Sequence, residues 1–184
     1  MLPDLPRCLV HYEFASYEDV IRFAQERNGY MDDAIKYLRS HLSDLATTEL
    51  LMLVQNTFWE LIDDITAAVF RRISHMSNHD LLDFLKYFAK YTIVQDTVRD
   101  RLETFELEQL YKIVEVAPLL RASVVQHMET RIPGMNDTLL IELMRKLPEL
   151  HDYVLIAFSE LLSSLSNESS KCILHMILIL GHTL

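Results

Sequence analysis

The chain is poor in residues that make turns and cross-links, since its 184 residues include only three glycines, five prolines and two cysteines. Sandwiches and barrels need frequent turn-forming residues, so this scarcity argues against an all-β fold. Cys8 and Cys172 stand 164 positions apart, which gives neither a disulfide framework nor the spacing of a metal site. We therefore expect reduced cysteines and an intracellular or organellar protein.

Positive charge is also scarce, because 17 Lys and Arg residues face 27 Asp and Glu residues, for a net charge of −10. A protein that wraps nucleic acid by charge needs clustered Lys and Arg, so RNA contact would require a local basic stripe. The longest apolar run, Cys172 to Gly181, is too short to span a bilayer and contains His175. We expect a soluble protein with no membrane span. The first residues, Met-Leu-Pro-Asp-Leu-Pro, resemble neither a secretory signal nor a clear mitochondrial presequence.

What the chain does contain is an apolar pattern that returns every 29 to 31 positions. Its leading column, with apolar partners four and eight residues earlier, is Leu42, Ile73, Leu102, Ile132 and Leu162. A second column lies upstream at nearly the same period and consists of Val20, Leu51, Leu81, Leu110 and Leu140. These spacings place one apolar stripe on each of two helices per repeat. The pattern predicts an all-α fold, an α-solenoid of about five helical-hairpin repeats of ~30 residues plus a C-terminal helix.

Start signals for the helices recur in the same phase. N-cap residue types precede most first helices, at Ser16, Thr47, Ser77 and Asn136, and Asp32, Asp63, Thr92 and Asp152 are expected to cap second helices. We predict an N-terminal arm at 1–15, hairpin repeats over 16–165 and an apolar helix at 166–184. The repeats themselves are expected at 16–45, 46–75, 76–104, 105–134 and 135–165.

The sequence contains no arrangement of residues typical of a catalytic site. It has no glycine-rich phosphate loop, nucleophile elbow or paired cysteine ligands. His75 and His79 have a spacing that metal sites use, but without a third ligand nearby they are better interpreted as solvated turn histidines. Asp32-Asp33 and Asp63-Asp64 fall at helix starts, where negative charge is favourable. We therefore predict a protein that is not an enzyme and uses no cofactor or metal.

One set of basic residues recurs with the repeat, just before the leading apolar column. Its members and near neighbours are His41, Arg71, Arg72, Arg99, Arg101 and Arg131. Stacked repeats would align these residues along one edge, where guanidinium groups bind phosphates or an acidic partner segment bidentately. The alternative is that cations in the last turn of a helix complement its negative end. The structural interpretation is favoured, and RNA contact along this edge remains open.

The C-terminal segment is apolar on every side, whereas a terminal repeat normally has a polar outer face. Its exposed residues are expected to dock on a partner chain or a second copy, and they are Ile173, Leu174, Met176, Ile177, Leu178 and Leu180.

The repeat, with its Leu-Leu-x-x-Leu-like first helix, a turn such as Ala-Pro-Leu-Leu and a second helix ending in Leu or Ile, resembles a known family. It is similar to the heptatricopeptide and octotricopeptide helical-hairpin repeats of organellar RNA-metabolism proteins, best over 78–102, 107–132 and 138–165. This resemblance implies a place in mitochondrial ribosomes or RNA processing. The repeat is shorter than is usual in that family and the chain is acidic, which favours a structural subunit held mainly by other proteins.

Together these features predict a non-catalytic scaffold or assembly subunit of an organellar ribonucleoprotein complex, in the mitochondrion. Its partners would be other protein subunits, with RNA as a further partner along the basic edge and self-association through the C-terminal end. The alternative is a cytosolic adaptor that captures a partner helix in its groove.

Overall fold

The computed structural model describes residues 2, 4–9, 12, 14–56 and 58–164, and over this part of the chain it consists of helices and turns without strands. The predicted all-α class is confirmed. The chain divides into two compact units, one ending at Phe105 and the next beginning at Glu106. The solenoid arrangement of the whole chain remains a prediction.

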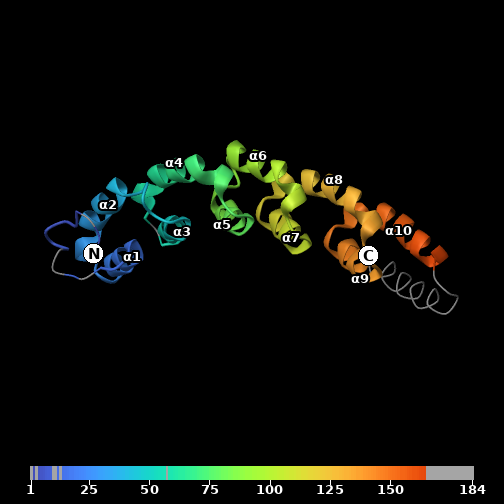
Figure 1. Cartoon of the computed structure of the whole chain (residues 1–184), viewed down its shortest axis with the longest axis horizontal. Coiled ribbons are helices and arrows are strands. Elements are labelled where there is room, and N and C mark those ends of the chain that lie inside the picture. Colours follow the sequence, from blue (N-terminus) through green and yellow to red (C-terminus); the bar gives the residue numbers. More distant parts are fainter. Residues whose placement is uncertain (1, 3, 10–11, 13, 57, 165–184) are drawn as a thin grey trace. The chain divides into compact units, whose positions relative to one another are not determined.

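The first unit contains three helical hairpins in succession (Figure 1). They are α1 (Tyr17–Glu26) with α2 (Met31–Ser40), α3 (Thr47–Gln55) with α4 (Ile62–Arg72), and α5 (Asn78–Phe88) with α6 (Thr92–Asp100). The first helices pack on one another, α1 against α3 and α3 against α5. Each hairpin therefore buries one side against the next, as expected for helix pairs that cannot bury their apolar faces alone.

The second unit repeats the arrangement with two hairpins. They are α7 (Leu107–Val116) with α8 (Arg121–Arg131), and α9 (Asp137–Lys146) with α10 (His151–Ser164). The 3₁₀ turn η6 (Ile132–Gly134) follows α8 and contacts α10, while η7 (Pro148–Leu150) precedes α10 and contacts α8. The two hairpins therefore pack on each other through these turns.

The repeat columns form the core. In the leading column, the described members Leu42, Ile73, Leu102 and Ile132 are at most 8% exposed. Their partners four and eight residues earlier are also buried, and they are Leu38, Val69, Val98, Met128, Phe158, Ala34, Ile65, Val94, Val124 and Val154. The spacing of four residues places these side chains on one helix face, so the periodicity read from the sequence identified the buried face of every second helix.

The upstream column is confirmed in four repeats and wrong by one residue in the second. Leu50, not Leu51, is completely buried in α3. The same shift affects the start of the helix, because the N-cap is Ala46 rather than Thr47, and the carboxylate of Glu49 accepts the Ala46 amide at 2.7 Å. Counting from the true N-cap restores the common spacing of four residues to the first core leucine.

Second helices begin differently from the prediction. Asp32 and Asp63 lie inside the first turns of α2 and α4, whose N-cap residues Tyr30 and Leu61 make no side-chain cap bond. These helices instead continue directly from a 3₁₀ turn, so their caps are replaced by the turn's own backbone bonds. The acidic residues still lie at the positive end of the helix dipole, as expected.

The predicted helix at 166–184, with docking residues Ile173, Leu174, Met176, Ile177, Leu178 and Leu180, lies outside the described residues. Within the described part, none of the helices has the length and apolar character needed to cross a bilayer.

Candidate functional site

The basic edge predicted from the sequence begins with two arginines that bind backbone rather than remain free. Arg72 ends α4 and donates from Nη1 to the carbonyl oxygen of Leu45 at 2.5 Å, and from Nη2 to that of Leu42 at 3.2 Å and that of Ser43. Arg101 follows α6 and donates from Nη1 to the carbonyl oxygen of Met76 at 2.6 Å and from Nη2 to that of Ser74. Each guanidinium fork thus holds the turn that precedes its own hairpin.

The two arginines make equivalent contacts. Each stands one residue before a member of the leading column and bonds the carbonyls one and three residues after the preceding member of that column. We call Arg72 and Arg101 the inter-repeat arginines. Arg131 occupies the same sequence position and lies in the last turn of α8. Five donors in a rigid fork suit Arg for bonding several carbonyls at once, which Lys cannot do.

The other predicted edge residues do not converge on one site. The Nδ1 atom of His41 lies 2.9 Å from the carbonyl oxygen of Tyr37, and its ring packs on the Tyr37 ring at 4.4 Å. Arg99 bonds Asp96 within α6, with an N–O distance of 2.5 Å. Arg71 is exposed and, with Arg72 and His75, lines a hollow of about 250 Å³. These contacts favour the structural interpretation of the edge, and RNA binding along it stays a prediction.

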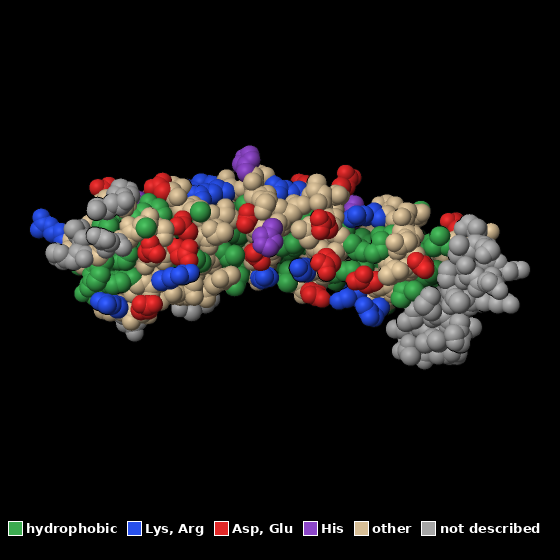
Figure 2. Space-filling model, turned by 60° about the horizontal axis from the view of Figure 1, so that its bottom comes forward, with side chains coloured by type: hydrophobic (Ala, Val, Ile, Leu, Met, Phe, Trp, Pro, Cys, Tyr) green, Lys and Arg blue, Asp and Glu red, His purple; other side chains and the backbone are tan. Residues whose placement is uncertain are grey.

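Charge on the visible face of the molecule is mixed. In the space-filling view, Lys and Arg side chains are scattered among Asp and Glu side chains in the described part of each unit (Figure 2). A track for a phosphate backbone needs clustered Lys and Arg, and the mixed charge seen here does not favour one.

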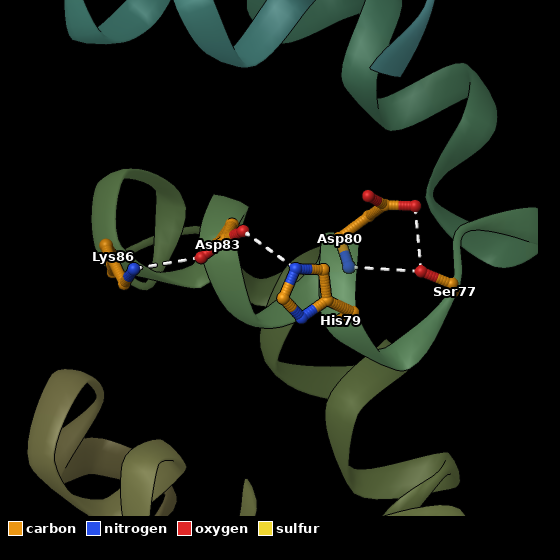
Figure 3. Close-up of polar contacts among 5 residues, drawn as sticks. All are labelled: Ser77, His79, Asp80, Asp83 and Lys86. Carbon is orange, nitrogen blue, oxygen red and sulfur yellow. Dashed lines mark hydrogen bonds and ion pairs between the residues drawn. The ribbon is translucent and has the colours of Figure 1, made fainter. Parts of the chain in front are cut away.

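The two histidines considered for a metal make different contacts: His75 lines the hollow beside Arg71, and His79 pairs with a carboxylate of its own helix. His79 lies in the first turn of α5, where its Nε2 is 3.7 Å from Asp83 Oδ2, and Asp83 also accepts from Lys86 at 2.9 Å (Figure 3). The nearby carboxylate of Asp80 accepts from the Ser77 hydroxyl at 2.8 Å as part of the helix cap. Among the described residues, no three His, Cys, Asp or Glu side chains are grouped so as to hold a metal ion.

A surface that the sequence analysis missed lies on the outer side of α8 and α10. Its most exposed apolar side chains are Leu119 at 71%, Ile156 at 60% and Tyr153 at 47%. Two hollows follow it, one of about 600 Å³ along α8 and one of about 110 Å³ where the end of α8 and η6 meet α10, and Glu129 lines both. We call this the α8–α10 surface, and its main residues are Leu119, Ala122, Val125, Gln126, Glu129, Tyr153, Ile156, Ala157 and Glu160.

Helix geometry explains why these residues face outward together. On α8 the core takes Val124 and Met128, which leaves Ala122, Val125, Gln126 and Glu129, spaced i, i+3, i+4 and i+7, on another face. In α10 the corresponding spacing places Tyr153, Ile156 and Glu160 on the exposed side, while Ala157, which also lines the second hollow, is buried. In η5 (Pro118–Leu120), successive side chains point about a third of a turn apart, so Leu120 is buried while Leu119 is exposed.

The same outer positions are polar in α6, the last helix of the first unit. In α6 the residues equivalent to Ala122, Val125, Gln126 and Glu129 are Thr92, Gln95, Asp96 and Arg99. An apolar outer face is therefore not needed to build a hairpin of this kind. The α8–α10 surface could have been found in the sequence by comparing the repeats at positions outside the core columns, where α8 and α6 carry different residue types.

The rim of the α8–α10 surface is acidic. Arg121 lines the larger hollow but is bound bidentately to Glu149, with Nε–Oε1 and Nη2–Oε2 distances of 2.5 and 3.0 Å. The hydrogen bond from Arg121 holds the pKa of the Glu149 carboxyl below its usual range. Within the part of the chain described, the carboxylates of Glu129 and Glu160 have no ion-pair partner.

Apolar side chains lie at the centre of this surface, and the carboxylates of Glu129 and Glu160 lie at its edge. Comparisons of the chain with protein families, with characterised proteins and with solved structures found no match.

Proposed function

We propose that this chain is a non-catalytic helical-repeat scaffold that binds other proteins, with the α8–α10 surface as a contact site. The observation that carries the proposal is the exposure of Leu119 beside one hollow and of Tyr153 and Ile156 beside the next, with Glu129 lining both hollows. Exposing large apolar side chains together costs free energy in water, and contiguous patches of this kind mark interaction sites. The polar residues at the equivalent outer positions of α6 support a role beyond folding.

The setting we propose is an assembly, such as an organellar ribonucleoprotein complex, as the resemblance to organellar helical-hairpin repeats suggests. A mitochondrial ribosome or RNA-processing complex would hold such a subunit mainly through protein contacts. A cytosolic adaptor that binds one partner helix is the alternative, and it uses the same surface in the same way.

Site-specific photo-crosslinking in cells that express the chain tests the proposal. A benzoylphenylalanine placed at Gln126, on the α8–α10 surface, should form adducts with a defined protein. The matched control is the same amino acid at Asp96, the equivalent exposed position of α6. Protein adducts at position 126 that are absent at position 96 support the proposal; equal or absent labelling at both positions contradicts it.

A second candidate function is RNA contact, which the hollow lined by Arg71, Arg72 and His75 favours. Fluorescence anisotropy with a mixed-sequence single-stranded RNA, measured from low to high salt, tests it. RNA contact at this hollow requires salt-dependent affinity that Arg71→Glu weakens and Lys112→Glu, a control on α7, does not. Under the leading proposal, neither substitution changes any binding of RNA.

A further inference from the structure

We infer that the α8–α10 surface receives an amphipathic helix of a partner protein whose apolar stripe is flanked by Lys or Arg residues. This inference deepens the proposed function and rests on it. It states which chemistry the partner presents, which the exposure of apolar side chains alone does not settle.

The shape of the surface fits a helix. The end of α8 and the turn η6 meet α10 here, and the hollow is lined by Ile132 and Pro133 of that turn on one side and by Tyr153, Ile156 and Ala157 of α10 on the other. At 1.5 Å per residue, the 11 residues of α8 are about 16 Å long, or about three helical turns. That length matches anchors spaced i, i+3 or i+4, and i+7 on a bound helix.

The described part of the chain offers no strand to which an extended peptide could add. Such a peptide binds mainly through main-chain hydrogen bonds to a sheet edge. The backbone donors and acceptors of α8 and α10 are used within the helices, so a helical partner, which satisfies its own backbone, is the better match.

Charge determines the flanks of that helix. Glu129 lines both hollows and Glu160 lines the second, and neither carboxylate is paired within the described residues. Arg121, the cation at this surface, is already bound to Glu149. A partner with anionic flanks would meet free carboxylates in a chain whose net charge is −10, whereas Lys or Arg would pair with them.

The chain's own C-terminal segment fits the α8–α10 surface less well, again because of its charge. Residues 166–184 contain one lysine, Lys171, and one glutamate, Glu168, so the segment has a single cation for the two carboxylates of Glu129 and Glu160. A second copy of the chain would bring further negative charge. Both occupants remain outcomes of the test.

Binding of designed helical peptides to the purified full chain tests the inference by fluorescence anisotropy. The probe is an 18-residue helix with Leu on one stripe and Lys on both flanks, and two matched peptides carry Glu flanks or a scrambled stripe. We expect the Lys-flanked peptide to bind at least about tenfold more tightly than either control, since every tenfold corresponds to about 1.4 kcal/mol. Its affinity should fall as salt rises.

Variants of the chain locate the binding. Glu129→Lys or Glu160→Lys should each weaken the Lys-flanked peptide several-fold and strengthen the Glu-flanked one. Glu108→Lys makes the same change of charge on the exposed side of α7 and should leave both affinities unchanged. All three sites are on the surface, so circular dichroism should show the same helix content in each variant.

Four results would overturn the inference. The first is equal affinity for Lys- and Glu-flanked peptides, and the second is no binding of any designed helix. The third is tighter binding of a synthetic peptide of residues 166–184, and the fourth is dimers in light scattering that Ile156→Asp dissociates. If crosslinking at Gln126 still finds a protein partner, the proposed function stands while the helix inference fails; if it does not, both fail.

Discussion

Arg101 reaches back to the preceding hairpin and donates from Nη1 to the main-chain carbonyl oxygen of Met76 at 2.6 Å. The contact joins residues 25 positions apart, and Arg72 makes the equivalent contact with Leu45. A carbonyl oxygen in a turn is present whatever side chain the residue carries. The inter-repeat arginines therefore link hairpins through atoms that substitutions in the turn cannot remove.

Replacing Arg101 with Met should lower the free energy of unfolding by about 2 kcal/mol, because hydrogen bonds from a charged donor to Ser74 and Met76 are lost. Arg99→Met is the matched control: this exposed side chain pairs with Asp96 inside α6, so its loss should cost less than about 0.5 kcal/mol. Urea denaturation followed by circular dichroism measures both. A cost for Arg101→Met no larger than that of the control would contradict the linking role.

Charge alone should not rescue this contact. Arg101→Lys keeps the cation but lacks the planar fork that serves two carbonyls, so we expect it to recover less than half of the lost stability. Full recovery by Lys would show that Arg101 acts through its charge at the end of α6.

The corrected phase of α3 gives a prediction with a built-in control. Leu50→Ala removes a completely buried side chain and should cost about 2 to 5 kcal/mol, while Leu51→Ala, at a half-buried neighbour, should cost about 1 kcal/mol. Thermal and urea unfolding of both variants compares them directly. The reverse order of costs would mean that the phase read from the sequence was right and the observed one wrong.

Acid should weaken the first helix through one carboxylate. Asp19 accepts from the amides of Ser16 and Ala15, each at 2.9 Å, and these bonds lower the pKa of its carboxyl. A carboxylate with a lowered folded-state pKa stabilises the protein above its unfolded pKa of about 3.9, and loses that contribution as the pH falls through the folded value.

Asp19→Asn should therefore lower stability by about 0.5 to 1 kcal/mol at pH 7, and the difference from the unchanged protein should shrink below about pH 4. The melting temperatures of the variant and of the unchanged protein, measured from pH 7 to pH 3, give this difference in stability. A difference that stays constant over this range would show that the charge of Asp19 is not what matters.

A buried hydroxyl in the second unit should be dispensable. The Tyr111 side chain is 6% exposed, its hydroxyl has no hydrogen-bond partner among the described residues, and burial raises its pKa to about 12. Tyr111→Phe removes this unsatisfied group and keeps the ring, so we expect the free energy of unfolding to rise by up to about 1 kcal/mol. A loss above about 1 kcal/mol on urea denaturation would show that the hydroxyl has a stabilising partner.

The repeat period was enough to predict the class of fold and the buried face of each second helix. Side chains such as Val69 and Val98 recur four residues before the leading column, and packing requires that spacing wherever one helix face is covered. Capping chemistry gave the starts of α1 and α5 at Ser16 and Ser77, since a hydroxyl there accepts a free amide.

Other features depend on information that side-chain types do not carry. Thr47 has the better capping side chain, yet Ala46 is the cap, because Glu49 three residues later bonds its amide. The arginines were visible in the sequence, but their acceptors are carbonyl oxygens, which every residue has. The α8–α10 surface was missed because Val125 and Ile156 are apolar and so look like core residues in the sequence. Only the orientation of each helix shows that they lie outside the core.

The outer face of α6 has Thr92 and Gln95 where that of α8 has Ala122 and Val125, on hairpins whose interiors follow the same pattern. In a tandem array of this kind, substitutions on the outward face of one segment leave the fold of its neighbours intact. Recognition can thus evolve, or be engineered, one hairpin at a time, because outward residues can be exchanged without redesigning the core columns that hold the hairpins together.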